Sequence, residues 1–116
     1  MRRGTTLEIL TVGLALLCAC SARAANSQQV AYGRRLVETN CARCHAVGPA
    51  GESTHPGAPP FRSLHLRYPV EDLGEALAEG ISTGHPDMPE FVATPEQIEA
   101  IIAYIKSLGQ RGKTNQ

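Results

Sequence analysis

Residues 40–48 read NCARCHAVG. Within them, Cys41 and Cys44 stand three positions apart, and His45 follows the second cysteine directly. Thiols and imidazoles are side chains that bind metals and react with cofactors. Several chemistries use this spacing, and the rest of the chain indicates which of them applies.

The first two dozen residues have the features of an export signal. Two arginines precede an apolar run from Ile9 to Ala19, and an A-x-A pattern of small residues ends at Ala24. This order is typical of a secretory signal peptide, so we expect residues 1–24 to be removed and no stable membrane insertion to remain. One alternative is a membrane anchor, although the run falls short of the roughly 20 residues that span a bilayer. The other is lipid attachment at Cys20.

The remaining chain, residues 25–116, has the length of one small domain. Loss of the signal removes three of the 11 basic residues and one of the 11 acidic residues, which leaves a slight negative excess. Lysine and arginine are scattered rather than clustered, so we expect no nucleic-acid partner. A domain of this size without tryptophan buries a marginal apolar core, and it needs a staple or a cofactor.

Three segments carry helical signals, and no strand pattern of useful length is present. The predicted helices cover residues 28–40, 69–81 and 94–109, each with apolar residues near helical spacing. Between them lie two proline-containing loops, residues 46–68 and 82–91. The sequence therefore predicts an all-α domain with long, stiffened loops.

Two of these helices carry recognisable ends. Pro69 opens the second at its first position. In the third, Thr94 and Gln97 form a capping box around a helix that starts at Pro95, and Gly109 is expected to end it.

Three of the four chemistries for the CARCH segment find little support. A zinc site needs a second ligand pair, but no other cysteine follows residue 24, and His55, His65 and His85 are widely spaced. A thioredoxin-like redox pair expects a βαβ context, whereas the flanks here are helical. A structural disulfide across so short a loop stabilises little.

The fourth chemistry is covalent attachment of one haem c. Cys41 and Cys44 add to the two vinyl groups on one edge of the porphyrin, and the adjacent His45 becomes an axial ligand of the iron. The two residues between the cysteines span the distance between the vinyl positions. A haem also supplies the apolar body that so small a domain lacks.

Met88 is the predicted second axial ligand. It is the one methionine after residue 24, and Pro86 and Pro89 restrict the backbone on both sides of it. A thioether is a soft, neutral ligand that favours reduced iron. The alternatives are His85 or His65 in this position, or an open position.

The order of these motifs resembles that of the class I c-type cytochromes. A first helix, CARCH, a proline loop, a second helix, GHPDMPEF and a terminal helix with EAIIAYIKSL follow one another from about Val30 to Leu108. The resemblance implies the cytochrome c fold, with three main helices and long loops wrapped around one covalently attached haem. It also implies a small, His/Met-ligated monohaem protein of the bacterial periplasm, with residues 25–116 as its cytochrome c domain.

The resemblance implies a close crossing of the first and last helices, formed by Gly33, Val37, Ile101 and Tyr104. A glycine inside a helix costs about 1 kcal/mol relative to alanine, which a close helix contact offsets.

Further residues around the haem follow from the same resemblance. The carbonyl group of Pro59 accepts the Nδ1–H of His45 and so fixes the ring. Phe61 packs on the haem. Tyr68, or alternatively Arg62, hydrogen-bonds a haem propionate.

The implied function is electron transport: the protein takes single electrons from one redox protein and passes them to another. Because both faces of the iron are ligated, we expect the protein not to be an enzyme. It acts as a monomer or as a subunit of an oxidoreductase complex. Two alternatives stay open, a dedicated haem subunit of a periplasmic oxidoreductase complex, and a haem sensor or enzyme with an open axial position.

Overall fold

The computed structural model describes residues 23–24, 26–80 and 87–114. Within these ranges every regular element is a helix and no residue forms a strand, which confirms the all-α prediction. An N-terminal helix covers residues 26–40. The 3-10 helices η1 and η2 and the α-helices α2 and α3 follow at Phe61–Leu66, Val70–Asp72, Leu73–Glu79 and Pro95–Thr114. No helix of the described ranges has both the length and the apolar character needed to cross a bilayer.

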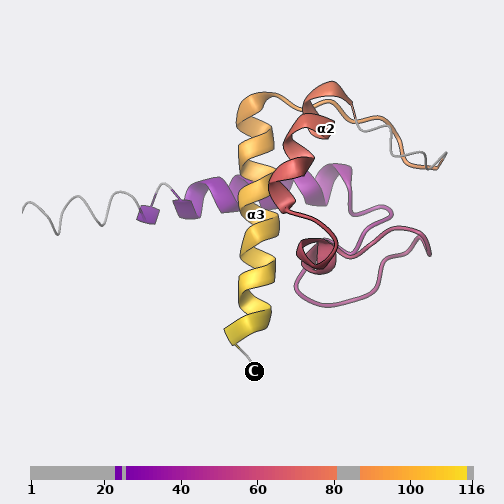
Figure 1. Ribbon diagram of the computed structural model, residues 1–116, viewed down its shortest axis with the longest axis horizontal. Coiled ribbons are helices and arrows are strands. Elements are labelled where there is room, and N and C mark those ends of the chain that lie inside the picture. Colours follow the sequence, from indigo (N-terminus) through magenta and orange to yellow (C-terminus); the bar gives the residue numbers. More distant parts are fainter. Residues whose placement is uncertain (1–22, 25, 81–86, 115–116) are drawn as a thin grey trace, which may run out of the picture.

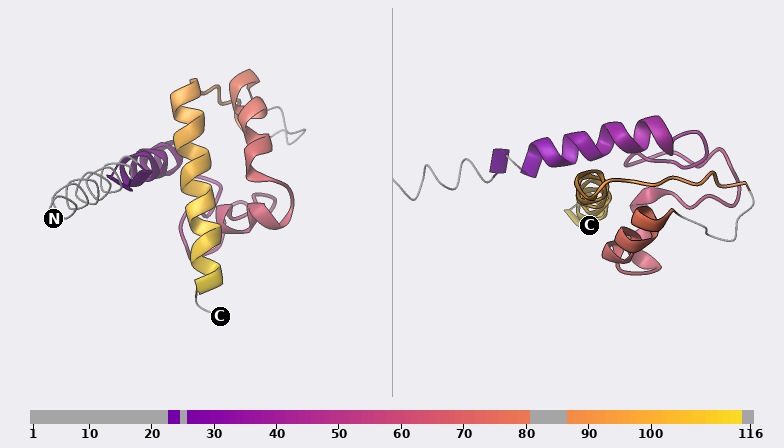
Figure 2. Two further views of the ribbon diagram at one scale, coloured as in Figure 1. Left: turned by 60° about the vertical axis from the view of Figure 1, so that its left-hand side comes forward. Right: turned by 90° about the horizontal axis from the view of Figure 1, so that it is seen from above.

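Helix α3 is the central element of the fold (Figure 1). The N-terminal helix lies across one side of α3, while η1, η2 and α2 pack against it from the other side (Figure 2). The chain between the N-terminal helix and η1 extends to the same side of this core as the segment that leads into α3. The CARCH segment and the Met88 segment therefore belong to one side of the molecule.

The helices cross closely because Gly33 has no side chain. A Cβ atom at position 33 would lie 1.8 Å from the carbonyl oxygen of Ala100 and 3.0 Å from the Cβ of Tyr104. Val37 lies one turn further along the N-terminal helix and is fully buried. Ile101 on α3 is almost fully buried as well. The predicted crossing is therefore confirmed, and Ala100 is an additional contact.

One small apolar cluster holds the helices together. Full burial of one large aliphatic or aromatic side chain contributes roughly 1.5–3 kcal/mol, so a cluster of this size supports only a marginally stable fold. Its buried members are Val37, Val47, Phe61, Leu64, Val70, Leu77, Ala93, Ile101, Tyr104, Ile105 and Leu108.

Helix α3 begins as the sequence predicts. The N–H of Thr94 donates to Oε1 of Gln97 at 3.0 Å, and the N–H of Gln97 donates to Oγ1 of Thr94 at 3.4 Å. These reciprocal bonds are the predicted capping box, and they satisfy N–H groups that have no partner inside the helix.

The predicted end of this helix at Gly109 is wrong, because α3 continues to Thr114. Among the described residues only Gly51 and Gly80 have a positive φ angle, so Gly109 does not have the left-handed conformation of a C-terminal cap. A Cβ atom at position 109 would lie 3.0 Å from Nδ1 of His65. This glycine therefore makes room for a neighbouring ring.

The second predicted helix, residues 69–81, is shorter than expected. Pro69 precedes the 3-10 turn η2, and the α-helical part starts only at Leu73. The helix ends at Glu79, and the next residue, Gly80, has a φ of 91°, which favours glycine. Ile81 and the rest of residues 81–86 lie outside the described residues. The predicted loop 46–68 contains the short helix η1, which the sequence pattern did not indicate.

We expect Gly33→Ala to destabilise the protein by at least about 2 kcal/mol, because the added methyl group must push apart the backbones of two helices. Gly74→Ala is a matched control, since a Cβ there meets only ordinary contacts, the nearest at 3.7 Å. The control should be neutral, or stabilising by up to about 1 kcal/mol, because alanine favours the helix. Urea unfolding of both variants measures the difference, and equal effects would contradict the close crossing.

Candidate functional site

The CARCH segment forms a tight turn at the end of the N-terminal helix. The carbonyl oxygen of Val37 accepts the N–H groups of Cys41 at 2.9 Å and Ala42 at 3.1 Å. The carbonyl oxygen of Cys41 then accepts those of Cys44 at 3.2 Å and His45 at 3.0 Å. A single turn therefore carries both thiols and the imidazole, as attachment to one flat cofactor requires.

The ring of His45 is held from two directions. Its Nδ1 lies 2.8 Å from the carbonyl oxygen of Pro59, which can only accept, so Nδ1 carries the proton. The Nε2 lone pair is then available to a metal. The buried ring of Phe61 lies beside the imidazole, with centroids 5.1 Å apart and planes tilted by 51°. The contact with Pro59 that the resemblance implies is thus present, and Phe61 lines the same ring.

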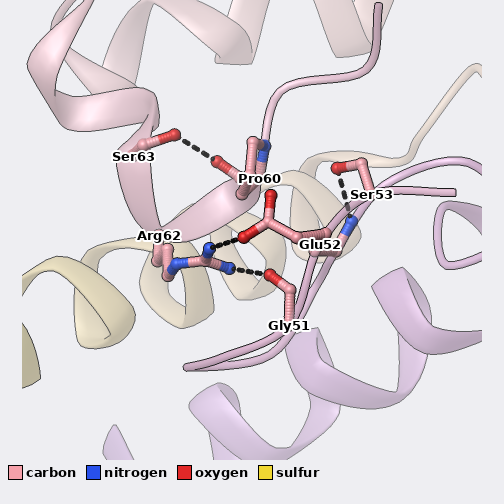
Figure 3. A network of polar contacts seen from close by, with 7 residues as sticks. Gly51, Glu52, Ser53, Pro60, Arg62 and Ser63 are labelled. Carbon is pink, nitrogen blue, oxygen red and sulfur yellow. Dashed lines mark hydrogen bonds and ion pairs between the residues drawn. The ribbon is translucent and has the colours of Figure 1, made fainter. Parts of the chain in front are cut away.

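Backbone bonds close the loop that follows the histidine. The N–H of Ala46 donates to Oγ of Ser53 at 3.0 Å, and the carbonyl oxygen of Ala46 accepts the N–H of Phe61 at 2.9 Å. Figure 3 shows the bond that the hydroxyl group of Ser53 accepts. Ala46, the residue after His45, is therefore bonded both to the middle of the loop at Ser53 and to its far end at Phe61, which keeps the Pro59 carbonyl opposite the imidazole. The sequence pattern did not indicate the role of Ser53.

Arg62 crosses the same loop. Its Nη1 donates to the carbonyl oxygen of Gly51 at 2.7 Å, and its Nη2 lies 3.4 Å from Oε1 of Glu52 (Figure 3). The guanidinium group is therefore engaged within the loop. Tyr68 follows η1 and remains 36% exposed. Partial burial raises the pKa of its hydroxyl, and Arg67 opposes this shift, so Tyr68 stays a neutral donor at pH 7.

Both thiols of the CARCH turn are free and partly exposed. Burial raises the pKa of Cys41 to about 11, because the thiolate is disfavoured away from water, so this thiol stays protonated at neutral pH. Nothing in the described ranges gathers three or more His, Cys, Asp or Glu side chains into a metal-ion site.

This donor set fits covalent haem. Two unpaired thiols on one turn match two thioether bonds, and an imidazole with its Nδ1–H already paired offers Nε2 to the iron. The apolar ring of Phe61 beside that imidazole suits a porphyrin face.

Met88 lies in the segment that leads into α3, and it is half-buried between exposed neighbours. Its neighbour Asp87 places one carboxylate oxygen 3.4 Å from Nε2 of His55. The backbone N–H of His55 in turn donates to the carbonyl oxygen of Cys44 at 3.2 Å. This chain of contacts links the Met88 segment to the CARCH turn. The alternative ligand His85 and the neighbouring Pro86 lie outside the described residues, and His65 packs at Gly109 on α3.

A buried hydrogen bond joins α3 to the same turn. The hydroxyl group of Tyr104 donates to the carbonyl oxygen of Val47 at 2.8 Å. Tyr104 was expected only at the helix crossing, and its position in the sequence gave no signal for this bond. The central helix therefore fixes the chain two residues after His45.

Comparison with known proteins identifies the family. Residues 28–105 match the family model described as cytochrome C oxidase, cbb3-type, subunit III. The chain belongs to this family. Membership makes it a c-type cytochrome whose cofactor is covalently bound haem c, and it agrees with the all-α cytochrome c fold.

Two curated relatives of this cbb3-type family member are oxidase subunits. The cbb3-type cytochrome c oxidase subunit CcoP of Rubrivivax gelatinosus is 31% identical over 87 residues, which cover 75% of this chain and 28% of the relative. Subunit FixP of the cbb3-type oxidase of Sinorhizobium medicae (strain WSM419) is 29% identical over 126 aligned positions. The alignment covers 85% of this chain and 43% of the relative. The chain thus spans less than half the length of these relatives. No solved structure matches it.

We expect Tyr104→Phe to lower the free energy of unfolding by about 1–3 kcal/mol, because the buried carbonyl of Val47 loses its donor. Tyr32→Phe is the control: it removes a hydroxyl group but keeps the ring that faces the Arg35 guanidinium. Denaturant unfolding of both haem-loaded variants tests this. Equal decreases in the free energy of unfolding would show that the Tyr104–Val47 hydrogen bond stabilises the fold no more than the Tyr32 hydroxyl does.

Proposed function

We propose that this chain is an electron-transferring haem subunit of an oxidoreductase complex of the cbb3 oxidase type. The match of residues 28–105 to the subunit III family carries the proposal. Both curated relatives are named as oxidase subunits, which favours this role over that of a free monomeric carrier.

In this proposal Cys41 and Cys44 hold one haem c through two thioether bonds, and His45 and Met88 are the axial ligands. When bound, haem c supplies a one-electron redox couple. The Pro59 carbonyl keeps His45 in one orientation through Nδ1, and the Phe61 ring supports it from the side. Tyr68 is the proposed propionate donor. Ligands on both faces of the iron leave no position for a substrate, so we propose that the chain itself is not an enzyme.

The proposed setting is the periplasm, reached through a signal peptide at residues 1–24. The domain then receives electrons from one redox protein and passes them to another within the complex. A free shuttle usually carries a ring of charges that steers fast, salt-dependent encounters. Lysine occurs in this chain only at positions 106 and 113, and the ammonium group of Lys106 is already paired with Glu71 at 2.6 Å. Because arginine also carries steering charge, the match to the subunit family, rather than the scarcity of lysine, favours the subunit over the shuttle.

Purification of the tagged, haem-loaded protein from detergent-solubilised membranes of its native cell tests the assembly. We expect the protein to co-purify with cytochrome oxidase subunits and to stay bound at high salt, because subunit interfaces are large and apolar. A protein that elutes alone, with fast and salt-sensitive electron transfer to a partner, would instead be a free shuttle.

The Met88 ligand has its own test. We expect Met88→Ala to lose the sulfur–iron charge-transfer band of the ferric protein while the haem stays attached through acid–acetone extraction. His65→Ala and His85→Ala should keep the band. Absence of the band in the unsubstituted protein, or its loss in either histidine variant alone, contradicts the assignment.

A further inference from the structure

His55 lies in a surface loop, and hydrogen bonds fix both its backbone and its ring. Its N–H donates to the carbonyl oxygen of Cys44 at 3.2 Å, and its own carbonyl oxygen accepts the N–H of Ala58 at 3.1 Å. The ring is fixed as well, because Nδ1 accepts the N–H of Gly57 at 3.2 Å. The imidazole is therefore oriented by the backbone that surrounds the CARCH turn.

This orientation determines which ring nitrogen faces outward. Since Nδ1 acts as an acceptor, the proton of a neutral imidazole sits on Nε2. Nε2 is the atom that lies 3.4 Å from Oδ2 of Asp87. The attraction between the two side chains does not require a charged histidine, because a neutral N–H already points its positive end at the carboxylate.

Asp87 is the residue directly before Met88. Further along, the same segment is fixed by the N–H of Ala93, which donates to the carbonyl oxygen of Leu77 at 2.8 Å. This bond lies five residues beyond Met88. It ties the segment to α2 and not to the CARCH turn. The His55–Asp87 contact thus joins the Met88 segment to the turn that carries His45.

We propose that His55 and Asp87 form a positioning pair that holds the Met88 segment against the CARCH turn and thereby disfavours, at equilibrium, displacement of the Met88 sulfur by other ligands. This inference rests on the proposed function, since it takes Met88 as an axial ligand. Neither residue touches the iron: His55 acts through Asp87, and Asp87 acts through the backbone of Met88. The side chains are 42% and 72% exposed, so solvent weakens the pair and its effect is modest.

Cyanide titration of the ferric, haem-loaded protein tests the pair, because cyanide must displace the Met88 sulfur to bind. We expect Asp87→Ala and His55→Ala each to bind cyanide about two to five times more tightly than the unsubstituted protein, in line with exposed ion pairs of about 0.4–1 kcal/mol. Alanine rather than asparagine is needed at position 87, because the amide oxygen of asparagine could still accept the Nε2–H of His55. The Asp87→Ala/His55→Ala double variant should resemble the single variants, since either change alone removes the contact.

Glu71→Gln is the matched control. It removes a carboxylate that makes an exposed ion pair between two other elements, 2.6 Å from Lys106, and should leave cyanide affinity unchanged. The proposal is overturned if the single variants match this control, or if their effects add in the double variant. If the unsubstituted protein lacks the sulfur–iron band, the Met88 ligand itself fails, and the positioning pair fails with it. A retained band with unchanged cyanide affinity rejects the pair alone.

Discussion

The close contact of Gly33 with the backbone of Ala100 sets the spacing of the two longest helices. The CARCH turn follows directly after the end of the N-terminal helix. Its position therefore depends on how that helix lies on α3 (Figure 1). The same α3 carries Tyr104, which lies against Gly33 and whose hydroxyl group also donates a hydrogen bond to the carbonyl oxygen of Val47. The helix crossing therefore fixes the chain on both sides of the CARCH turn, through the N-terminal helix before it and through the Tyr104–Val47 bond after it.

The functional turn depends on backbone geometry more than on charge. The His45 ring is oriented by the Pro59 carbonyl, and the loop that presents this carbonyl is closed at Ala46 by a hydroxyl group and an amide. Arg62 adds one further link across the loop. Exposed ion pairs contribute little individually, whereas these bonds satisfy polar groups in a partly buried site. A small apolar core can thus support a precise site, because the site is fixed by local bonds.

Family membership and the oxidase-subunit names of the curated relatives support the proposed role within a larger assembly. The relatives are more than twice as long as the segment they share with this chain. A haem domain of this kind has to hold its cofactor and expose it to neighbours. The described residues meet the first of these requirements at the CARCH turn.

The sequence by itself determined the helical class, the capping box at Thr94, the glycine at the helix crossing and the candidate ligands at Cys41, Cys44 and His45. These features are local or depend on a spacing that one turn of chain fulfils. The pattern failed at Gly109, because a glycine that ends a helix and a glycine that makes room for a ring look alike in a sequence. Only the tertiary structure decided that the Tyr104 hydroxyl meets Val47 and that His55 meets Asp87. Both contacts join residues far apart in the chain, and no local periodicity records which distant group a side chain will face once the helices have packed.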